Sequence, residues 1–494
     1  MNPLLYQINT RCWLRDLSDR QGRPATLAEV PGEEFGMWER HGFTHIWLMG
    51  VWKTGPKALA LATNHPNLRA AYDEMIPGWT PRDVGGSPYS IAGYDVPDAM
   101  GGNEGLRLFR EKLNQRGMKL ILDFVPNHLG FDHPWVTERP ELFVQSPKPL
   151  DGDGTFAAET SSGPKWIAHA KDPHFPPWTD VAQIEYRKQS VRDTMQELLL
   201  SVAARCDGVR CDMAMLLLNE VFARTWAHLP CAEPTPATEF WDVAIPAVKR
   251  AQPGFSFMAE VYWGLESRLQ QMGFDYTYDK QLYDELHWRH TVGVQHRLTH
   301  SPQEYIARSI HFLENHDEPR VAAALGLPEH QAAALLILAL PGMRFLHDGQ
   351  LTGARIKIPV QLARRPPEPV NVEIQEMYDK LLTSLKKTSV GRGHGKILKT
   401  HAAWHGNPSG QNIVAVLWQS GPVAFDLAVV NLAGHRSQAY LPLSVSKLAD
   451  HIWEMRDVLS DETHERSGRD LARKGLYVDL EAHAAQLFEF TPAK

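Results

Sequence analysis

The 494-residue sequence has few cysteines and no segment typical of export or membrane insertion. Its four cysteines, at positions 12, 206, 211 and 231, form no CxxC pair and lack zinc-site spacing. We therefore expect neither a disulfide framework nor a cysteine-based metal site. No run of about 18 apolar residues occurs, and the first residues do not resemble a signal peptide. The sequence thus predicts a cytoplasmic protein with no membrane partner.

Long basic runs are also absent, and the formal net charge is −7. Nucleic-acid binders usually carry a basic face that contacts phosphates, so we expect no nucleic-acid partner. Aromatic residues, by contrast, are frequent, with 15 Trp and 13 Tyr. Flat aromatic rings fill protein cores, and they also stack on the apolar faces of sugars. The composition is therefore compatible with a carbohydrate ligand, although each ring taken singly is explained by core packing.

Short apolar runs alternate with helical patterns over the first 390 residues. This rhythm is typical of a parallel sheet, and the run 27–41 reads as one of its helices. Eight such segments with insertions predict a (β/α)8 TIM barrel, whose functional groups gather at the carboxyl ends of the strands. A doubly wound open sheet is the alternative. The predicted strands are 6–10, 44–49, 119–125, 207–212, 255–261, 274–278, 310–314 and 343–346.

Two regions depart from this rhythm. Residues 130–180 are rich in Pro, Gly, Asp and Trp and have little periodicity, which predicts a subdomain inserted after the third strand. After residue 392 the strand-like runs become short and closely spaced, as in an antiparallel β-sandwich. We therefore predict a barrel formed by 1–129 and 181–392, an inserted subdomain at 130–180 and a C-terminal β-sandwich domain at 393–494. The segment from about 51 to 100 reads as a long functional loop.

The segment Asp207–Asp212 places Arg210 and Asp212 two residues apart on a predicted strand. Residues i and i+2 of a strand point to the same side, so these two side chains face one site. The guanidinium then keeps the carboxylate ionised and orients it. Seen alone, an Arg-x-Asp triplet is most simply a structural ion pair at a strand end.

Three other predicted strands also end in acidic or imidazole side chains, and in a closed barrel all of them meet at one rim. Buried carboxylates are costly unless they are paired or used in chemistry. Two carboxylates suffice to hydrolyse a glycosidic bond, and a metal site is the rival use of such a cluster. The groups concerned are Asp123 with Asn127 and His128, Glu260, and His316 with Asp317.

Four motifs in this order resemble the signature regions of the α-amylase family, glycoside hydrolase family 13. They are DFVPNH at 123–128, GVRCD at 208–212, AEV at 259–261 and FLENHD at 312–317. They lie on the third, fourth, fifth and seventh predicted strands. The resemblance covers residues 5–390 as the barrel with its insertion, and the β-rich tail is similar to the family's C-terminal domain.

The resemblance implies a role for each matching residue. Asp212 corresponds to the nucleophile, Glu260 to the general acid/base, and Asp317 to the carboxylate that holds substrate hydroxyls. Arg210 corresponds to the arginine that orients the nucleophile, and Asp123 to a residue that supports the site. The histidines that bind the sugar in the cleaved subsite correspond to His128 and His316, and Tyr89 to the tyrosine stacked under that sugar.

The resemblance further implies cleavage of α-glucosidic bonds with retention, with short α-glucans or malto-oligosaccharides as substrates and no required cofactor. Asn127 matches a position that binds calcium in many members. Met213 to Leu216 replace the Lys-His pair that many starch-degrading members carry, so we expect a less polar aglycone side. A transglycosylase with the same catalytic residues is the first alternative. A non-catalytic binding relative and a metal-dependent hydrolase are the others, and the oligomeric state stays open.

Overall fold

The computed structural model describes residues 2–152, 154–421 and 424–493, and its centre is a closed barrel of eight parallel strands. All eight predicted strands are present, so the predicted TIM barrel is confirmed and the open sheet is excluded. Each strand pairs with its neighbours in chain order, and the last pairs with the first. The strands are β1 (Leu4–Asn9), β2 (His45–Met49), β5 (Lys119–Phe124), β11 (Gly208–Cys211), β12 (Ser256–Ala259), β13 (Tyr276–Tyr278), β14 (Ser309–His311) and β15 (Met343–His347).

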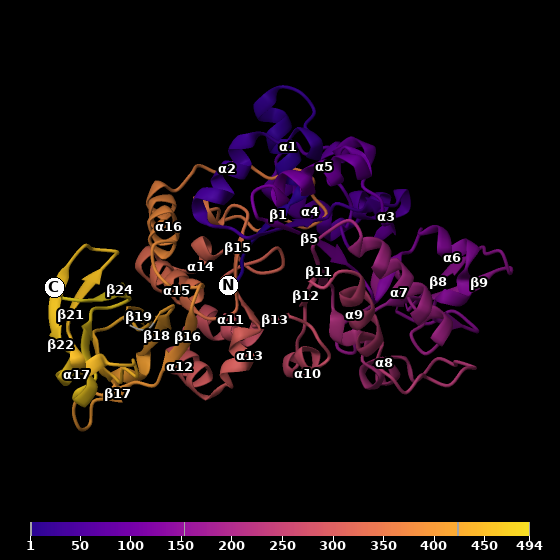
Figure 1. The fold of residues 1–494 in the computed structure, drawn as a ribbon. Helices are drawn as coiled ribbons and strands as arrows, with labels where there is room; N and C mark the ends of the chain where they lie inside the picture. The colour runs from indigo at the N-terminus through magenta and orange to yellow at the C-terminus, as the bar shows by residue number, and fades with distance from the viewer. Residues whose placement is uncertain (1, 153, 422–423, 494) are drawn as a thin grey trace.

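Helices cover the outside of the barrel (Figure 1). Parallel strands need crossover connections, and helices provide them while burying the outer face of the sheet. The barrel interior is filled by large apolar side chains such as Trp47, Met258 and Phe345. The helices are α1 (Thr10–Gln21), α2 (Gly32–His41), α5 (Gly102–Asn114), α7 (Gln189–Ala203), α8 (Asn219–Trp226), α9 (Phe240–Ala251), α10 (Glu266–Gln271), α11 (Lys280–His287), α12 (Thr291–His300), α13 (Gln303–Ala307), α14 (Val321–Ala324), α15 (Leu327–Ala339) and α16 (Val372–Leu385).

Two local predictions are wrong. The single helix predicted over 27–41 is a short 3₁₀ turn at Leu27–Glu29 followed by α2, because Pro31 has extended backbone dihedrals and lacks an N–H. The segment 51–100 is not one long loop. It contains two helices, α3 (Pro56–Asn64) and α4 (Pro66–Met75), and a small pair of strands, β3 (Lys53–Thr54) and β4 (Ile91–Gly93).

An antiparallel sheet is inserted into the connection between the third barrel strand, β5, and helix α7. It packs through Phe156, Ile167 and Val181 and lies at one end of the molecule (Figure 1). The region coincides with the predicted insertion, whose bounds of 130–180 stay a prediction. Its elements are β6 (His128–Gly130), α6 (Pro134–Glu138), β7 (Gln145–Ser146), β8 (Thr155–Ala158), β9 (Lys165–Ala170) and β10 (Trp178–Gln183).

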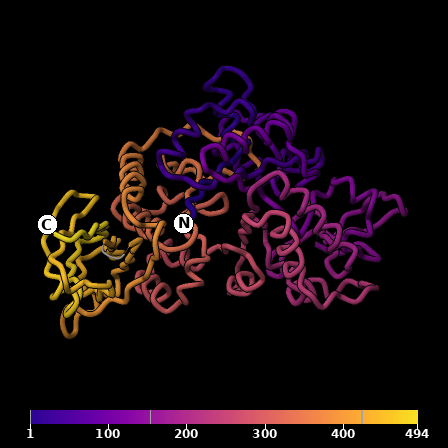
Figure 2. The backbone as a smooth tube through the Cα atoms, viewed as in Figure 1, coloured from indigo at the N-terminus to yellow at the C-terminus, as the bar shows by residue number. Residues whose placement is uncertain are grey.

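Antiparallel sheets form the C-terminal part, from His394 onward, and lie at the opposite end of the molecule from the inserted sheet (Figure 2). One sheet has the order β16-β18-β19-β24-β21-β22 and the other β17-β20-β23, and their facing side chains form one apolar core. The strands are β16 (His394–Leu398), β17 (His401–Ala402), β18 (Ile413–Gln419), β19 (Phe425–Asn431), β20 (Ser437–Leu441), β21 (Ile452–Asp457), β22 (Thr463–Ser467), β23 (Leu476–Leu480) and β24 (Ala485–Pro492), with helix α17 (Gly468–Lys474).

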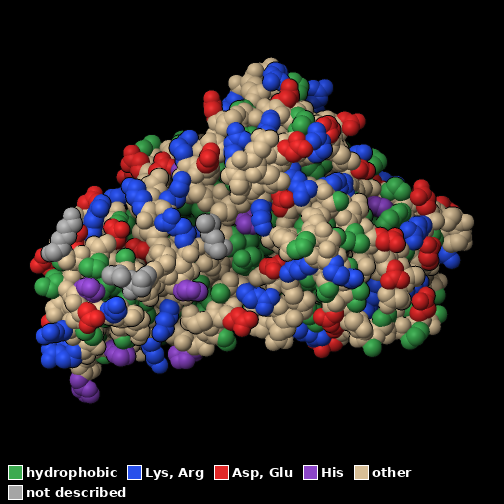
Figure 3. Space-filling view, in the orientation of Figure 1, with side chains coloured by type: hydrophobic (Ala, Val, Ile, Leu, Met, Phe, Trp, Pro, Cys, Tyr) green, Lys and Arg blue, Asp and Glu red, His purple; other side chains and the backbone are tan. Residues whose placement is uncertain are grey.

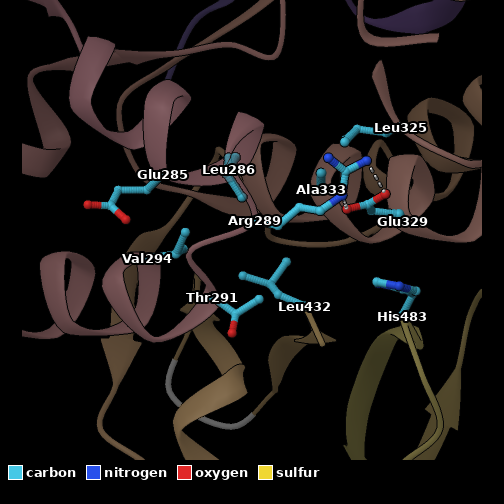
Figure 4. Close-up of a pocket in the computed structure, with 10 residues that line it drawn as sticks. All are labelled: Glu285, Leu286, Arg289, Thr291, Val294, Leu325, Glu329, Ala333, Leu432 and His483. Carbon is cyan, nitrogen blue, oxygen red and sulfur yellow. Dashed lines mark hydrogen bonds and ion pairs between the residues drawn. The ribbon is translucent and has the colours of Figure 1, made fainter. Parts of the chain in front are cut away.

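The large C-terminal sheet also packs on the barrel. Trp418 on β18 is fully buried, and its indole N–H donates to the Ala339 carbonyl at the end of α15 over 2.7 Å. A small cavity is also lined from both parts, by Arg289, which pairs with Glu329 over 2.8 Å, and by Leu432 of the C-terminal region (Figure 4). The barrel and the C-terminal sheets therefore share a packed seam.

Acidic and basic side chains are intermixed over the face shown in Figure 3. Within residues 2–152, 154–421 and 424–493, no helix has both the length and the apolar character needed to cross a membrane.

Candidate active site

The acidic residues predicted from the sequence sit at the carboxyl ends of neighbouring barrel strands. Asp123 is the penultimate residue of β5, whereas Asp212 and Glu260 directly follow β11 and β12. The strand ladder continues one residue beyond β11 and β12. The Asp212 N–H donates to Phe124 over 2.9 Å, and the Glu260 N–H donates to Cys211 over 3.0 Å. These bonds fix the backbone under both carboxylates.

Arg210 is fully buried and binds three of these carboxylates at once. Its guanidinium lies 2.6 Å from Asp212 Oδ1, 2.8 Å from Glu260 Oε2 and 3.7 Å from Asp123 Oδ1. The contact with Asp212 confirms that residues i and i+2 of β11 face one side. Because one planar guanidinium joins Asp212 and Glu260 through different nitrogen atoms, the two carboxyl groups are held at a fixed distance and orientation.

The surroundings of Glu260 and Asp212 act differently on their pKa values. Burial raises the pKa of Glu260 to about 7; Arg210 opposes this shift, and the charge of Asp212 adds to it. Burial also raises the pKa of Asp212, but both the charge and the hydrogen bond of Arg210 act against it. Near neutral pH Glu260 can therefore carry a proton, while Arg210 favours the ionised form of Asp212.

Two groups that the sequence did not predict hold the Glu260 carboxyl. The Tyr262 hydroxyl donates to Oε1 over 2.8 Å, and the Met213 backbone N–H donates to Oε2 over 2.8 Å. Met213 reaches this position with a φ of 44°, an uncommon backbone conformation for a side chain without a local polar group. The sequence singled out Met213 as part of the run that replaces the Lys-His pair, but not as a donor to Glu260.

His316, Tyr89 and Asp317 form a second group in contact with the first. His316 Nε2 lies 2.6 Å from the Tyr89 hydroxyl and 3.0 Å from Asp317 Oδ2, while its Nδ1 lies 2.6 Å from Gln7. Burial alone would raise the pKa of Asp317, but His316, Arg210 and Lys357 outweigh it and hold that pKa below its usual range. Since 47% of the Asp317 side chain is exposed, water screens part of this effect.

A cavity of about 360 Å³ opens above these groups. Its lining includes five of the predicted residues, while Arg210, Asp123 and His316 support it from below. His128 packs against Trp178, and burial lowers its pKa to about 3, so it is a neutral hydrogen-bonding group. The five lining residues are Tyr89, His128, Asp212, Glu260 and Asp317.

Asn127 does not reach this cavity. Its side-chain oxygen accepts a hydrogen bond from Gln183 over 3.0 Å, and its amide nitrogen lies 3.3 Å from His128. Among the described residues, no group of three His, Cys, Asp or Glu side chains is placed to hold a metal ion. The Asn127 side-chain oxygen thus already has a partner within the chain, and the chemistry below does not use a calcium ion.

The comparisons with known proteins agree with this geometry. The family model "Alpha amylase, catalytic domain" matches residues 39–377. An α-amylase from Haloarcula japonica is 24% identical over 265 residues, which are 53% of this chain and 36% of that protein. An α-1,4-glucan:maltose-1-phosphate maltosyltransferase from Cereibacter sphaeroides is 25% identical over 276 residues, which are 53% of this chain and 40% of that protein.

The chain thus spans less than half the length of these two curated relatives. The crystal structure of a maltogenic α-amylase, AmyB, from Thermotoga neapolitana superposes with a TM-score of 0.68 at 18% identity, covering 100% of both chains. That likeness supports the same fold from the first barrel strand to the C-terminal sheets. Because the family model matches well over half of the sequence, including all four motif regions, the chain belongs to the α-amylase family.

Proposed function

We propose that the chain is a retaining α-glycoside hydrolase that cleaves α-glucosidic bonds of malto-oligosaccharides or related short α-glucans. The observation that carries this proposal is the single Arg210 guanidinium that joins Asp212 and Glu260 at the floor of one cavity. A retaining mechanism needs two carboxyl groups about 5 to 5.5 Å apart, one ionised and one protonated. The guanidinium shared by Asp212 and Glu260 and the raised pKa of Glu260 support such an assignment.

In this mechanism the ionised Asp212 attacks the anomeric carbon and the bond to the leaving sugar breaks. Glu260 gives its proton to the departing glycosidic oxygen, which leaves as an alcohol. A water molecule then attacks the glycosyl-enzyme while Glu260, now a carboxylate, takes up the proton of that water. Asp212 is released, and the product keeps the α configuration.

The other residues bind the sugar whose bond is cleaved. Asp317 and His128 line the cavity and offer hydrogen bonds to its hydroxyl groups, while His316 holds Asp317 and Tyr89 in place from below. Tyr89 offers the face of its ring, which His316 fixes by a stacked contact and a hydrogen bond to the hydroxyl. Asp123 supports Arg210 from below.

Transfer to a sugar acceptor is the second candidate function. A second cavity of about 360 Å³ adjoins the catalytic cavity, and an acceptor bound there could replace water in the second step. Short incubations with maltotriose decide between the two, because transfer gives oligosaccharides longer than maltotriose at early times. Hydrolysis gives only shorter products.

Substitution of the two acids tests the proposal. Asp212→Asn removes the nucleophile and Glu260→Gln removes the titrating proton, so each is expected to lower kcat on maltotriose at least about a thousandfold. Both replacements keep the side-chain shape, so we expect both variants to stay folded. Measuring the thermal unfolding temperature of each variant checks this. Activity close to that of the unaltered chain in either variant contradicts the mechanism.

The cytoplasmic location predicted from the sequence is tested by cell fractionation.

A further inference from the structure

A cavity of about 230 Å³ lies at the end of the barrel opposite to the catalytic residues. Leu4 begins β1, Thr44 directly precedes β2 and Arg344 is the second residue of β15, so these lining residues mark the amino ends of parallel strands. The catalytic acids, by contrast, lie at the carboxyl ends. Lys386 and Arg392, at the end of α16 and in the turn after it, also line this space. We call it the lower cavity.

The lower cavity is lined by basic side chains. Arg344, Lys386 and Arg392 contribute to the lining, and no aspartate or glutamate of the described residues does. Lys386 and Arg392 are exposed, and their side chains donate to backbone carbonyl groups and form no ion pair with any described residue. His41 also lines the cavity, but its Nε2 already lies 2.7 Å from the Asp379 carboxylate. The lining therefore favours an anionic ligand.

Arg344 is a buried cation without an acidic partner. Only 8% of its surface is exposed, and no carboxylate of a described residue lies within ion-pair distance. Its guanidinium donates to the carbonyl of Asn2 over 3.0 Å and to those of Pro3 and Leu338 over 3.4 Å each. Burial lowers the pKa of Arg344 to about 10, and no neighbouring negative charge opposes this shift. A buried charge is costly unless it is paired, so an anion from outside the chain would supply the missing partner.

Arg11 shows how the chain satisfies a buried arginine that serves only the fold. It is as buried as Arg344 and also lacks an acidic partner among the described residues. Its guanidinium, however, donates to the Thr54 hydroxyl and to the carbonyls of three glycines over 2.5 to 3.2 Å. A guanidinium has five N–H groups, and the three longer bonds of Arg344 leave two of them for a ligand.

The rest of the lining leaves room beside this guanidinium. Gly391 has a φ of 76°, and a methyl group added there would lie 2.6 Å from a terminal nitrogen of Arg344. A side chain at this position would cover the guanidinium, so the glycine keeps that side of the cavity open. Buried apolar side chains, among them Leu382 and Leu385, line another part. They could pack against an uncharged part of a ligand.

We propose that the lower cavity binds a phosphate group, either free or as the ester of a small molecule, with buried Arg344 and exposed Lys386 and Arg392 as its ligands. Guanidinium groups suit this role because their N–H groups match the spacing of phosphate oxygens. The site lies at the other end of the barrel from the catalytic acids. Its occupation is therefore independent of the proposed chemistry on α-glucans.

Titration calorimetry of the full chain with inorganic phosphate, glycerol 3-phosphate and glycerol tests this assignment. We expect both phosphates to bind and glycerol to give no heat of binding. Lys386→Met keeps the side-chain stem and removes one charge, so it should weaken phosphate affinity about 10-fold. Lys387→Met is the matched control, because it removes the same charge from the next residue, which is exposed and does not line the cavity. It should change the affinity by no more than about twofold.

Arg344→Gln should abolish the heat of binding. Because Arg344 also holds the backbone of Asn2, thermal unfolding is measured beside it, and Lys386→Met decides if this variant does not fold. Tighter binding of glycerol 3-phosphate than of inorganic phosphate would identify an ester as the ligand, and the reverse order free phosphate. Absence of binding by both phosphates, glycerol binding as tight as that of its phosphate, or equal losses in Lys386→Met and Lys387→Met would overturn the assignment.

Discussion

At the scale of single residues, the site depends on charges that are removed from water. Arg210, Asp212 and Glu260 are each at most 6% exposed, so each would be strongly destabilising alone. Together they compensate one another, and Tyr262 and Met213 satisfy further lone pairs of Glu260. Burial still outweighs these contacts at Glu260 and raises its pKa, which is the property that a general acid needs.

The pH profile follows from that pKa. Glu260 must be protonated for the first step, and it loses its proton as the pH rises through about 7. We therefore expect kcat/KM on maltotriose to fall above that pH. With α-glucosyl fluoride the fall should be much weaker, because fluoride leaves without a proton. Rate measurements between pH 5 and 9 on both substrates provide the check, and parallel profiles would argue against Glu260 as the acid.

The residues that the sequence predicted and those that it missed differ in a physical way. Arg210 and Asp212 were predictable because two-residue spacing on a strand fixes their common direction. Gln7 contacts His316 across 309 positions of sequence. Such a contact arises only when the barrel closes, and no local spacing encodes it. Tyr262 lay beside Glu260 in the sequence, but its direction depends on the backbone after β12.

At the scale of elements, strand β11 sets the position of the nucleophile. It lies between β5 and β12, and its first residue, Gly208, is in close contact with both neighbours. A methyl group added there would lie 2.6 Å from the Ser256 carbonyl oxygen and 2.7 Å from Ile121 Cδ1. The strand can therefore approach its neighbours only because this position lacks a side chain.

Gly208→Ala is expected to destabilise the fold by about 1–3 kcal/mol through this overlap. It should also lower activity, because β11 must shift and carry Asp212 with it. Gly254→Ala is the control in the turn before β12, where an added methyl group meets no atom within 4 Å. Urea unfolding and kcat on maltotriose measure both effects. Equal stability of the two variants would show that the register of β11 is not fixed by close packing.

The barrel strands were predictable because most of them lie within short, largely apolar runs that are buried on both faces. The C-terminal strands β21 and β22 carry a weaker apolar signal in the sequence. Residues of β22 are largely exposed, and β21 alternates exposed and buried side chains at the sheet edge. Helices α3 and α4 have few buried residues and each begins with a proline, so the sequence favoured a loop there.

At the scale of the whole molecule, the C-terminal sheets complete the core of the barrel. From Ala332 to its end, helix α15 is apolar on all sides, which is typical of a helix buried on all faces. The barrel covers one side of it, and Trp418, Val430 and Leu432 of the C-terminal region belong to the same apolar cluster as its residues. We infer that the two parts stabilise each other although the sheets lie far along the chain from the catalytic motifs.

Trp418→Ala tests this coupling. Loss of the buried ring and of its bond to Ala339 should cost about 3–5 kcal/mol. Because the seam joins the two parts, we expect calorimetry to show one unfolding transition, shifted to lower temperature. Two separated transitions, with only the smaller one shifted, would mean that the C-terminal sheets unfold independently.

The central claim is that Asp212 forms a covalent bond with the sugar. The most direct measurement uses a fluorinated α-glucosyl fluoride that forms the glycosyl-enzyme faster than water removes the sugar, followed by peptide mass spectrometry. The mechanism predicts one fluorosugar per chain, attached to Asp212 in the peptide that contains Arg210 and Cys211. A sugar attached to Glu260 or to any other residue, or β-configured product without an adduct, would contradict it.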